Sequence, residues 1–263
     1  MTTQRPDRTF EELVAEGAAV STDGWDFSWF EGRATEERPP WGYAVTVAQR
    51  LAGAHAALDV QTGGGEVLNF ALGRAARQPA LVAATEGWAP NVARATALLR
   101  PRGVVVVACP EYAPLPFADG AFDLVASRHP VRPHWREIAR VLRPGGAYVA
   151  QHVGPGSVFE LVEYFLGPLS EERRNGRHPD RERADAEAAG LEVVDLRRAR
   201  LRMEFHDVGA VVHFLRKVIW MVPGFTVEAY TRQLRALHAR ITAEGPFVAH
   251  STRHFFDARK PDG

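Results

Sequence analysis

The chain has 263 residues, of which 46% are hydrophobic, and its 32 basic side chains balance 32 acidic ones. This composition is that of a globular protein with a sizeable core, and the zero net charge leaves no overall field to gather nucleic acid or an anionic membrane. No run approaches the roughly 20 apolar residues of a membrane span, and the polar first residues differ from a secretory signal. We therefore expect a cytoplasmic protein, a monomer or homodimer, that acts on a small molecule and binds neither nucleic acid nor membrane.

The N-terminal arm, residues 1–43, combines a short helix with a group of large aromatic side chains. Residues 9–20 suit a helix that begins after Thr9, with Glu12 as the partner in a capping box. The aromatic residues that follow lie among Gly and Pro, so they cannot all occupy one regular element. Either they anchor the arm to the main core or they form a lid over a substrate, since ligand pockets are rich in aromatic walls; the residues concerned are Trp25, Trp29, Phe30, Trp41 and Tyr43.

Residues 44–153 alternate between short apolar runs and amphipathic segments. Such alternation is typical of a parallel sheet covered by helices. The predicted fold class is therefore α/β, with a Rossmann-like, doubly wound and mostly parallel sheet. A helix starts at residue 44, strands are predicted at 56–60, 80–85, 103–108, 122–127 and 147–152, and further helices at 65–76, 92–99 and 135–142.

Residues 154–263 depart from this rhythm and are expected to complete the same domain. The charged stretch 170–189 mixes both signs and is expected to be solvated surface. Two later strands bring the sheet to seven, and the helices of this region are expected to form a cap over the substrate. The strands are predicted at 191–203 and 247–258, and the helices at about 157–166, at 207–220 with Asp207 as cap, and at 227–243.

A glycine-rich segment follows the first strand of the 44–153 region. Gly63, Gly64 and Gly65 stand where that strand turns into a helix, and glycines there let backbone amides approach a ligand. Taken alone, this pattern also fits a plain strand-to-helix turn. Acidic residues expected at the ends of successive strands strengthen the case, because an open α/β sheet binds its ligands there; they are Glu86, Glu111 and Asp123.

Together these motifs resemble the small-molecule, methyltransferase type 11-like branch of the class I S-adenosylmethionine-dependent methyltransferases. The resemblance covers about residues 44–153, and the motifs occur in family order and spacing. They are Leu58–Gly65 (LDVQTGGG), Thr85–Trp88 (TEGW), Glu111–Phe117 (EYAPLPF) with Phe122–Val125 (FDLV), and Ile138–Gly146 (IARVLRPGG).

The resemblance implies S-adenosyl-L-methionine as the cofactor and assigns residues to it. Gln61 departs from the family, which usually has glycine there, and its side chain is expected to contact the cofactor or narrow its pocket. The implied contacts are Asp59, Thr62, Gly63 and Gly65 at the methionine end, Glu86 at the ribose, Gly87 and Trp88 beside the adenine, Glu111 and the Tyr112 amide at the adenine amino group, and Ser127 after the fourth strand.

A nicotinamide-dependent dehydrogenase is the main alternative for such a fold. It would usually carry the Gly-x-Gly-x-x-Gly spacing, whereas position 68 is Leu. The Leu-Pro-Phe and Arg-Pro-Gly-Gly motifs also have no role in a dehydrogenase. The sequence therefore favours the methyltransferase.

Methyl transfer from a sulfonium requires mainly that the acceptor atom is held in line behind the methyl group. A base is needed only where the acceptor carries a proton. The candidate catalytic residues are His129, after the fourth strand, and Glu204, His206 and His213 in the cap, although each histidine also suits a structural role. Further candidate substrate contacts are His152, Tyr164 and Trp220.

Metal and thiol chemistry find little support in the sequence. Cys109 is the only cysteine, and its apolar neighbours predict a buried, unreactive thiol. His250 and His254 lie in the last strand, where we expect solvated edge positions. No group of His, Asp and Cys has the spacing of metal ligands, so no metal is predicted.

The sequence thus predicts an S-adenosylmethionine-dependent methyltransferase that acts on an N, O or C atom of a small metabolite. The aromatic arm and cap favour an aromatic or heterocyclic acceptor, such as an indole-containing natural product. Two alternatives stay open, namely an RNA methyltransferase and a catalytically silent cofactor-binding regulator.

Overall fold

The computed structural model describes residues 8–24 and 27–262, and the chain divides into two compact units. Each unit is assembled from separate segments, so the division differs from the predicted boundaries after residues 43 and 153. Stretches of the C-terminal half complete the second unit because they supply a helix and strand residues to its sheet. Unit 1 comprises 1–38, 156–176 and 200–252, and unit 2 comprises 39–155, 177–199 and 253–263.

The strands follow the order β1-β7-β8-β6-β5-β2-β3-β4. The pairs β2–β3, β2–β5, β3–β4 and β5–β6 are parallel, whereas β6–β8 and β1–β7 are antiparallel. The predicted α/β fold with a mostly parallel sheet is confirmed. The strands are β1 Ala34–Glu36, β2 Ala56–Asp59, β3 Leu81–Glu86, β4 Val105–Ala108, β5 Phe122–Arg128, β6 Leu142–Val153, β7 Glu192–Phe205 and β8 Phe247–Arg259.

The described residues form eight strands where seven were predicted. The additional strand is β1, which pairs Ala34–Glu36 with Met203–Phe205. Its three residues are too few to show the alternation by which a strand is recognised in a sequence. The five parallel-sheet strands expected between residues 56 and 152 are all present.

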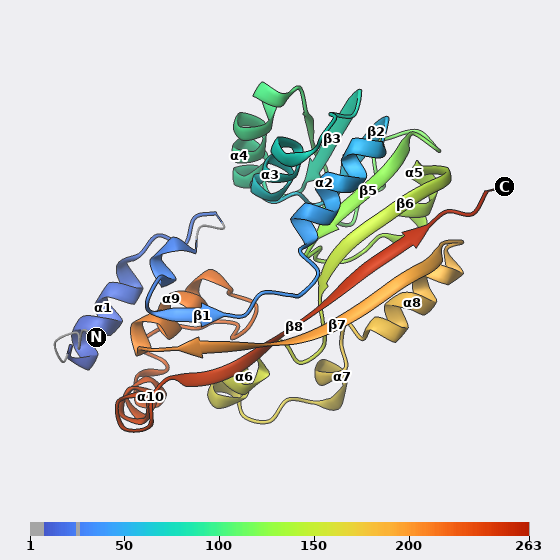
Figure 1. Cartoon of the computed structure of the whole chain (residues 1–263). Helices are drawn as coiled ribbons and strands as arrows, with labels where there is room; N and C mark the ends of the chain where they lie inside the picture. The colour runs from blue at the N-terminus through green and yellow to red at the C-terminus, as the bar shows by residue number, and fades with distance from the viewer. Residues whose placement is uncertain (1–7, 25–26, 263) are drawn as a thin grey trace. The chain divides into compact units, whose positions relative to one another are not determined.

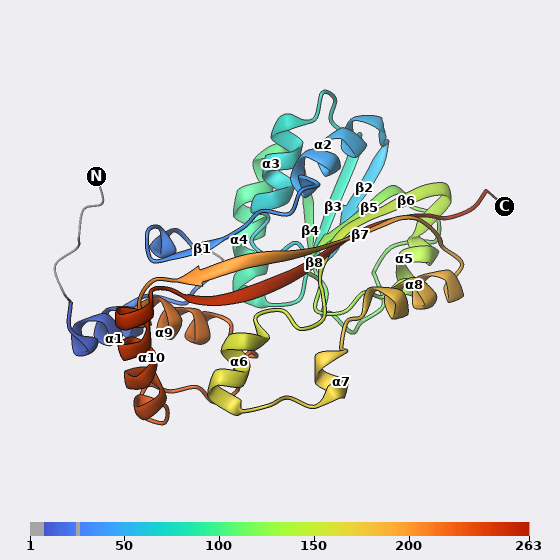
Figure 2. The same ribbon diagram turned by 60° about the horizontal axis from the view of Figure 1, so that its bottom comes forward.

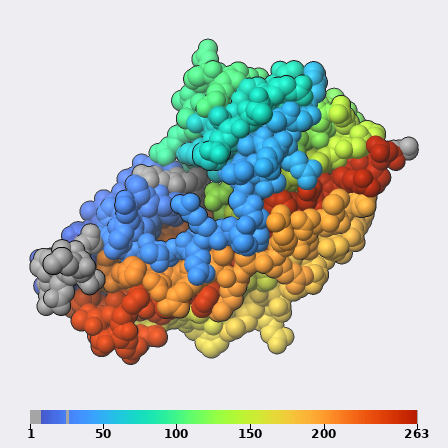
Figure 3. Space-filling model, in the orientation of Figure 1, coloured from blue at the N-terminus to red at the C-terminus, as the bar shows by residue number. Residues whose placement is uncertain are grey.

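The sheet of unit 2 is covered by helices on both faces (Figure 1, Figure 2). On one face, a buried cluster joins Leu51, Leu72 and Leu99 of α2, α3 and α4, and the outer sides of α2 and α3 face solvent (Figure 3). On the other face, Ile138 of α5 and Ala186 of α8 belong to a second cluster. This is the doubly wound arrangement; the helices are α2 Tyr43–Gly53, α3 Glu66–Arg74, α4 Ala89–Leu99, α5 Trp135–Val141 and α8 Pro179–Ala188, with the 3-10 turn η2 Arg100–Arg102.

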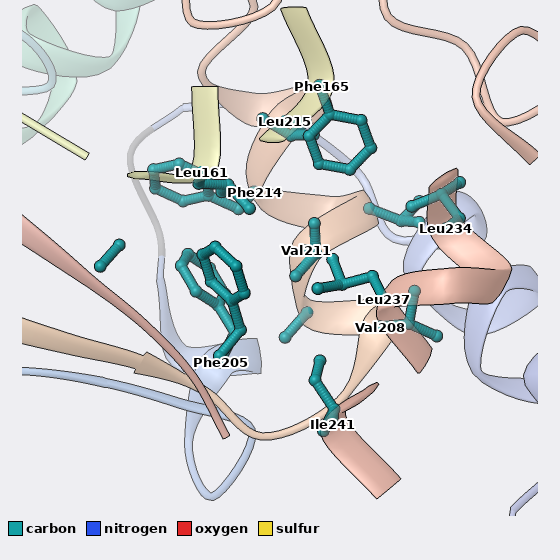
Figure 4. Close-up of a cluster of buried hydrophobic side chains, with 14 of the residues drawn as sticks. Leu161, Phe165, Phe205, Val208, Val211, Phe214, Leu215, Leu234, Leu237 and Ile241 are labelled. Carbon is teal, nitrogen blue, oxygen red and sulfur yellow. The ribbon is translucent and has the colours of Figure 1, made fainter. Parts of the chain in front are cut away.

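Unit 1 has its own apolar core, in which side chains of α6, of α10 and Phe205 of β7 pack around α9 (Figure 4). The helices α1 and α9 approach so closely that a Cβ atom added at Gly17 would lie 2.2 Å from the Gly209 carbonyl oxygen. The elements are α1 Phe10–Ala19, the 3-10 turn η1 Ser28–Phe30, α6 Phe159–Leu166, α7 Glu171–Arg174, α9 Val208–Lys217 and α10 Thr231–Glu244.

Two predicted helix caps are present. Thr9 and Glu12 form the capping box of α1, and Asp207 Oδ1 accepts the amide of Ala210 at 2.9 Å. The interpretation of residues 170–189 as solvated surface was wrong in part, since α8 lies there and buries Pro179, Glu182 and Ala186. Among the helices of the described residues, none is long and apolar enough to cross a membrane.

Candidate active site

The turn from β2 to α3 holds a run of left-handed backbone conformations. The φ angle is +57° at Gln61, +64° at Gly63 and +86° at Gly65, a region that glycine enters without steric cost. At Gly65 space is also limiting, because an added Cβ would lie 2.9 Å from the Leu99 side chain. The loop is therefore a tight turn that requires Gly65 for both its conformation and its packing.

Gln61 adopts the conformation for which the family uses glycine, and its side chain is used within the protein. Its Oε1 accepts the amide of Val131 at 2.7 Å, and its Nε2 donates to the carbonyl of Arg132 at 3.1 Å. Both ends of the amide group thus bind the loop that follows β5. The sequence predicted that this side chain contacts the cofactor or narrows its pocket. The geometry favours a different role, because Gln61 joins two loops.

Glu86 ends β3 with a carboxylate held by three backbone amides. Oε2 accepts the N–H of Gly63 at 2.8 Å, and Oε1 accepts those of Gly87 at 3.1 Å and Trp88 at 2.9 Å. The side chain is 9% exposed. The bonds fix the orientation of the carboxylate and tie it to the glycine loop, and the remaining lone pairs can accept hydroxyl groups such as those of a ribose.

Asp59 lies at the end of β2 and accepts the Thr62 hydroxyl at 2.6 Å. Burial raises the pKa of Asp59 to about 7, although the hydrogen bond from Thr62 opposes this, and the neighbouring Glu86 raises it further. A cationic ligand beside this buried carboxyl would stabilise its ionised form. The methionine end of S-adenosylmethionine carries an ammonium group, and the chemistry of Asp59 fits it.

The ends of β3 and β4 bring further predicted cofactor residues together. A Cβ atom added at Gly87 would lie 2.9 Å from Glu111 Oε2 and 3.2 Å from the Cys109 carbonyl oxygen, so the backbone at Gly87 closely approaches both. Trp88 and Tyr112 are 52% and 67% exposed. Their rings are therefore accessible to a planar ligand beside these acidic groups, as the resemblance implies. Cys109 is buried, as expected.

Asp123 lies at the opposite edge of the sheet, so its expected place at a ligand-binding strand end was wrong. It follows the first residue of β5, and its Oδ2 accepts the amides of His55 at 2.7 Å and Ala56 at 2.6 Å. Arg143 pairs with the other oxygen. Asp123 therefore holds the amino end of β2, a structural role.

The loop after β5 carries His129, which is oriented by a chain of hydrogen bonds. The Trp41 indole N–H donates to Gln151 Oε1 at 2.8 Å, so the Gln151 Nε2 group faces His129 Nε2 at 2.9 Å. An amide nitrogen donates, and His129 Nε2 therefore accepts, which puts the proton of the neutral ring on Nδ1. Burial and the positive charge of Arg128 hold the pKa of His129 well below 6.5. His129 is thus a neutral hydrogen-bond donor in this arrangement.

Two residues of the aromatic arm belong to the core of unit 2. Trp41 and Tyr43 are 8% and 6% exposed, which favours anchoring over a mobile lid. Burial and the charge of Asp59 raise the pKa of the Tyr43 phenol, so this ring lies near the expected cofactor site. Ser127 is buried, and its hydroxyl donates to the Val60 carbonyl at 2.9 Å.

The other candidate catalytic side chains belong to unit 1. His213 was placed at the edge of an apolar helix face, but it is 1% exposed, and the rings of Trp29 and Phe30 lie 5.0 Å from its own. A core histidine between aromatic rings does not suit a base. His206 is exposed, and its Nε2 lies 3.8 Å from Glu204 Oε2.

Two further candidate substrate residues of unit 1 differ in their surroundings. The hydroxyl of Tyr164 donates to the Gln233 carbonyl at 2.9 Å, which uses its polar end within the unit. Trp220 is 55% exposed and remains accessible to a ligand. Trp25 lies outside the described residues.

A cavity of about 890 Å³ opens in unit 2 along the loop after β5 and the helix α8. Arg132, Arg136, Arg177 and Arg181 line it, and none of these makes an ion pair with a described residue. The sequence analysis did not predict this cavity, because α8, which lines part of it, lies in the stretch that was interpreted as solvated surface. The remaining lining residues are Tyr112, Pro130, Val131, Pro133, His134, Trp135, Glu137, His152, His178, Glu182, Asp185, Ala188 and Ala189.

His152, Glu182 and His254 meet beside this cavity, a cluster that no local sequence pattern indicates. His152 was a candidate substrate contact, but it is 2% exposed. His254 was expected to be solvated, yet it is 1% exposed, because β8 lies between β7 and β6 and is not an edge strand. Strand order, which no local pattern encodes, decides its burial.

The fold is Rossmann-like, and a glycine turn and acidic side chains lie together at the carboxyl ends of its parallel strands. Residues 58–150 match the family model described as a methyltransferase domain. This segment belongs to that family, and the chain is an S-adenosylmethionine-dependent methyltransferase with S-adenosylmethionine as the methyl donor. The sequence matches no curated protein.

Solved structures share the fold at low sequence identity. A candidate methyltransferase of Bacillus halodurans C-125 has a TM-score of 0.59 and 20% identity, over 83% of this chain and 98% of that one. The [4+2]-cyclase SpnF has a TM-score of 0.53 and 21% identity, over 84% and 80%. A candidate sarcosine dimethylglycine methyltransferase of Galdieria sulphuraria has a TM-score of 0.50 and 18% identity, over 83% and 82%. These similarities establish the fold and leave the acceptor open.

Proposed function

We propose that the chain methylates an N, O or C atom of a small aromatic or heterocyclic metabolite, bound beside the carboxyl ends of β5 and β6 in unit 2. The observation that carries the proposal is the chain of hydrogen bonds from Trp41 through Gln151 to His129. It orients a polar group at a strand end next to the loop that Gln61 ties to the glycine turn. Natural-product metabolites with an indole ring fit this acceptor class.

The arginine-lined cavity supports a small acceptor. Its volume of about 890 Å³ lies in the range of about 300 to 1,000 Å³ that is usual for small-molecule sites. Tyr112, which the family resemblance assigns to the cofactor, also lines it, and its 67% exposed ring offers a flat surface. The arginines favour an acceptor that carries a carboxylate or a similar anionic group beside its ring.

His129 acts in this proposal as a positioning residue. S-adenosylmethionine supplies a methyl group that its sulfonium already activates. The protein then needs to hold the acceptor in line, and the Nδ1–H of neutral His129 is a suitable donor to an acceptor oxygen or nitrogen. As a base, His129 would first have to release the Gln151 amide, because that amide occupies its only free lone pair.

Incubation with labelled S-adenosylmethionine and fractionated metabolite extracts tests the activity, with products identified by mass spectrometry. A labelled small molecule is expected. Cofactor binding without transfer to any fraction would overturn the proposal and favour a silent regulator. Transfer to RNA, with binding that falls steeply as salt rises, would favour an RNA methyltransferase.

Substitutions at His129 separate positioning from base catalysis. His129→Ala is expected to lower kcat by roughly 10- to 100-fold without changing cofactor affinity, while His129→Gln, which keeps a neutral donor, retains most of the rate. His55→Ala, at the opposite edge of the sheet, is the control. If His129→Gln is as slow as His129→Ala and the wild-type rate follows the titration of a single base, positioning is the wrong role.

A further inference from the structure

Three side chains from distant segments of unit 2 converge on one point. His152 comes from the end of β6, Glu182 from α8 and His254 from β8. Glu182 Oε2 lies 2.6 Å from His152 Nδ1 and 2.7 Å from His254 Nε2. The two histidines are 2% and 1% exposed and Glu182 is 9% exposed.

Two imidazole nitrogens and one carboxylate oxygen are a ligand set that divalent transition metals prefer. The three ligand atoms lie within 4.8 Å of one another. Tetrahedral metal–ligand bonds of about 2.1 Å place neighbouring ligand atoms roughly 3.4 Å apart. The two contacts of Glu182, at 2.6 and 2.7 Å, have to widen by about 0.7 Å to admit the ion, a shift that rotation of the Glu182 side chain can supply. We propose that His152, Glu182 and His254 form a binding site for a divalent transition-metal ion such as Zn²⁺.

The surroundings hold the ligands in place. The hydroxyl of Tyr148 lies 3.0 Å from His152 Nε2, the ring nitrogen that points away from Glu182. With a metal on Nδ1, Nε2 carries the proton and donates it to Tyr148, and such a partner orients a metal-binding histidine. The ring of Phe256 stacks on His152 with an interplanar angle of 13°. The imidazole is therefore fixed on both its edge and its face.

The site also has an approach for the ion. His152 and Glu182 both line the arginine-rich cavity, so the ion can enter from it and keep a coordination position open toward it. One carboxylate offsets only part of a divalent charge, and Arg177 and Arg181 line the same cavity. The open position therefore favours an anionic or oxygen-bearing small ligand over a further protein ligand.

A purely structural role explains the cluster less well. A single oxygen of Glu182 takes both histidine contacts, and all three side chains are buried. Burying charged groups costs stability, and apolar side chains of the same size would usually serve packing better. The arrangement is understandable if the two nitrogens and the carboxylate act together on an ion.

Metal titration of the chelator-treated full-length protein tests this site directly, without S-adenosylmethionine. Zn²⁺ binding is measured by calorimetry, and Co²⁺ binding by its visible absorption, which reports nitrogen and oxygen coordination. One equivalent of each is expected to bind. His254→Ala and Glu182→Gln are expected to weaken binding by at least about 100-fold, since even loss of a ligand's hydrogen-bond partner typically costs about 10- to 100-fold.

The variants are chosen so that folding defects do not obscure the result. Glu182→Gln keeps the size of the side chain and an oxygen that accepts both histidines, and circular dichroism checks each fold. His178→Ala is the matched control, because His178 lines the same cavity outside the cluster. The proposal is overturned if the wild-type protein binds neither ion, or if the control loses binding as much as the cluster variants do. Because methyl transfer is not measured, failure here leaves the proposed function unaffected.

Discussion

The indole of Trp41 donates to Oε1 of Gln151 at 2.8 Å, and this bond determines how the protein presents His129. Because an indole nitrogen only donates, the oxygen end of the Gln151 amide must face Trp41. The nitrogen end then faces His129. A tryptophan in the core of unit 2 thus sets the tautomer of a histidine at the end of a neighbouring strand.

Replacing Trp41 with Phe is expected to release this control. The Gln151 amide can then rotate, and His129 samples both neutral tautomers. Nitrogen NMR of the His129 ring measures the change, from a proton on Nδ1 in the wild type to a mixture in Trp41→Phe. Trp220→Phe, in unit 1, is the control. A His129 spectrum that is the same in all three proteins would contradict the assigned role of Trp41.

Asp59→Asn is expected to stabilise the cofactor-free protein more strongly as the pH rises. The unfolded carboxyl loses its proton near its ordinary pKa of 3.8, but the folded one only near about 7. Wild-type stability therefore falls as the pH rises through this window, whereas the asparagine has nothing to ionise. The gain in Asp59→Asn should grow to roughly 1 to 4 kcal/mol above pH 7.

Chemical denaturation at several pH values measures the effect of Asp59→Asn. The same variant should bind S-adenosylmethionine more weakly, because asparagine lacks the negative charge that would contact the ammonium group of the cofactor. A stability gain that does not depend on pH would show that Asp59 is not the buried acid described above. Asp119→Asn, on an 81% exposed side chain, is a suitable control.

Gln61→Gly tests why a glutamine occupies a position of left-handed backbone. Glycine removes a strain of about 1 kcal/mol but loses the bonds to Val131 and Arg132. We expect a small net change in stability, faster hydrogen exchange at the Val131 amide and nearly unchanged cofactor affinity. A large loss of affinity would mean that Gln61 contacts the cofactor after all.

His213→Leu is expected to protect the protein against acid. Burial lowers the pKa of His213 to about 4, helped by the charges of Lys217, Arg216 and Arg33. The unfolded histidine takes up a proton below its ordinary 6.5, so the stability that the neutral ring contributes is lost as the pH falls from 6.5 towards 4. The variant should gain roughly 1 to 3 kcal/mol over the wild type near pH 4. An equal difference at neutral pH would contradict this explanation.

Local patterns predicted much of unit 2. The apolar runs that became β2, β3, β5 and β6 were recognised because covering helices bury them on both faces, and the run of valines in β4 was recognised although this edge strand is half exposed. The acidic residues Asp59, Glu86 and Glu111 could be placed at strand ends because the first two end such runs and Glu111 comes shortly after one. Asp123 was misplaced because it lies near the start of its strand, and the acidic side chain alone does not show which end faces the ligand.

The remaining errors concern properties that depend on distant partners. Glu182 lies in a segment whose average composition is that of a solvated surface. It is nevertheless buried, in contact with one histidine from β6 and one from β8. His213 was expected at the margin of a helix face, but Trp29 and Phe30 cover that margin. Neither arrangement leaves a periodic signal within the segment itself.

The position of β8 in the strand order bears on how the chain folds during synthesis. Arg253–Arg259 pair with Ala147–Val153 of β6, and a ribosome makes β8 after every other strand. Until then, the edge of β6 that β8 will cover has no neighbour in unit 2, and His254 has not yet reached His152 and Glu182. The nascent chain therefore exposes a long, apolar strand edge of the kind that chaperones protect, and it acquires its proposed metal site only once β8 has been made.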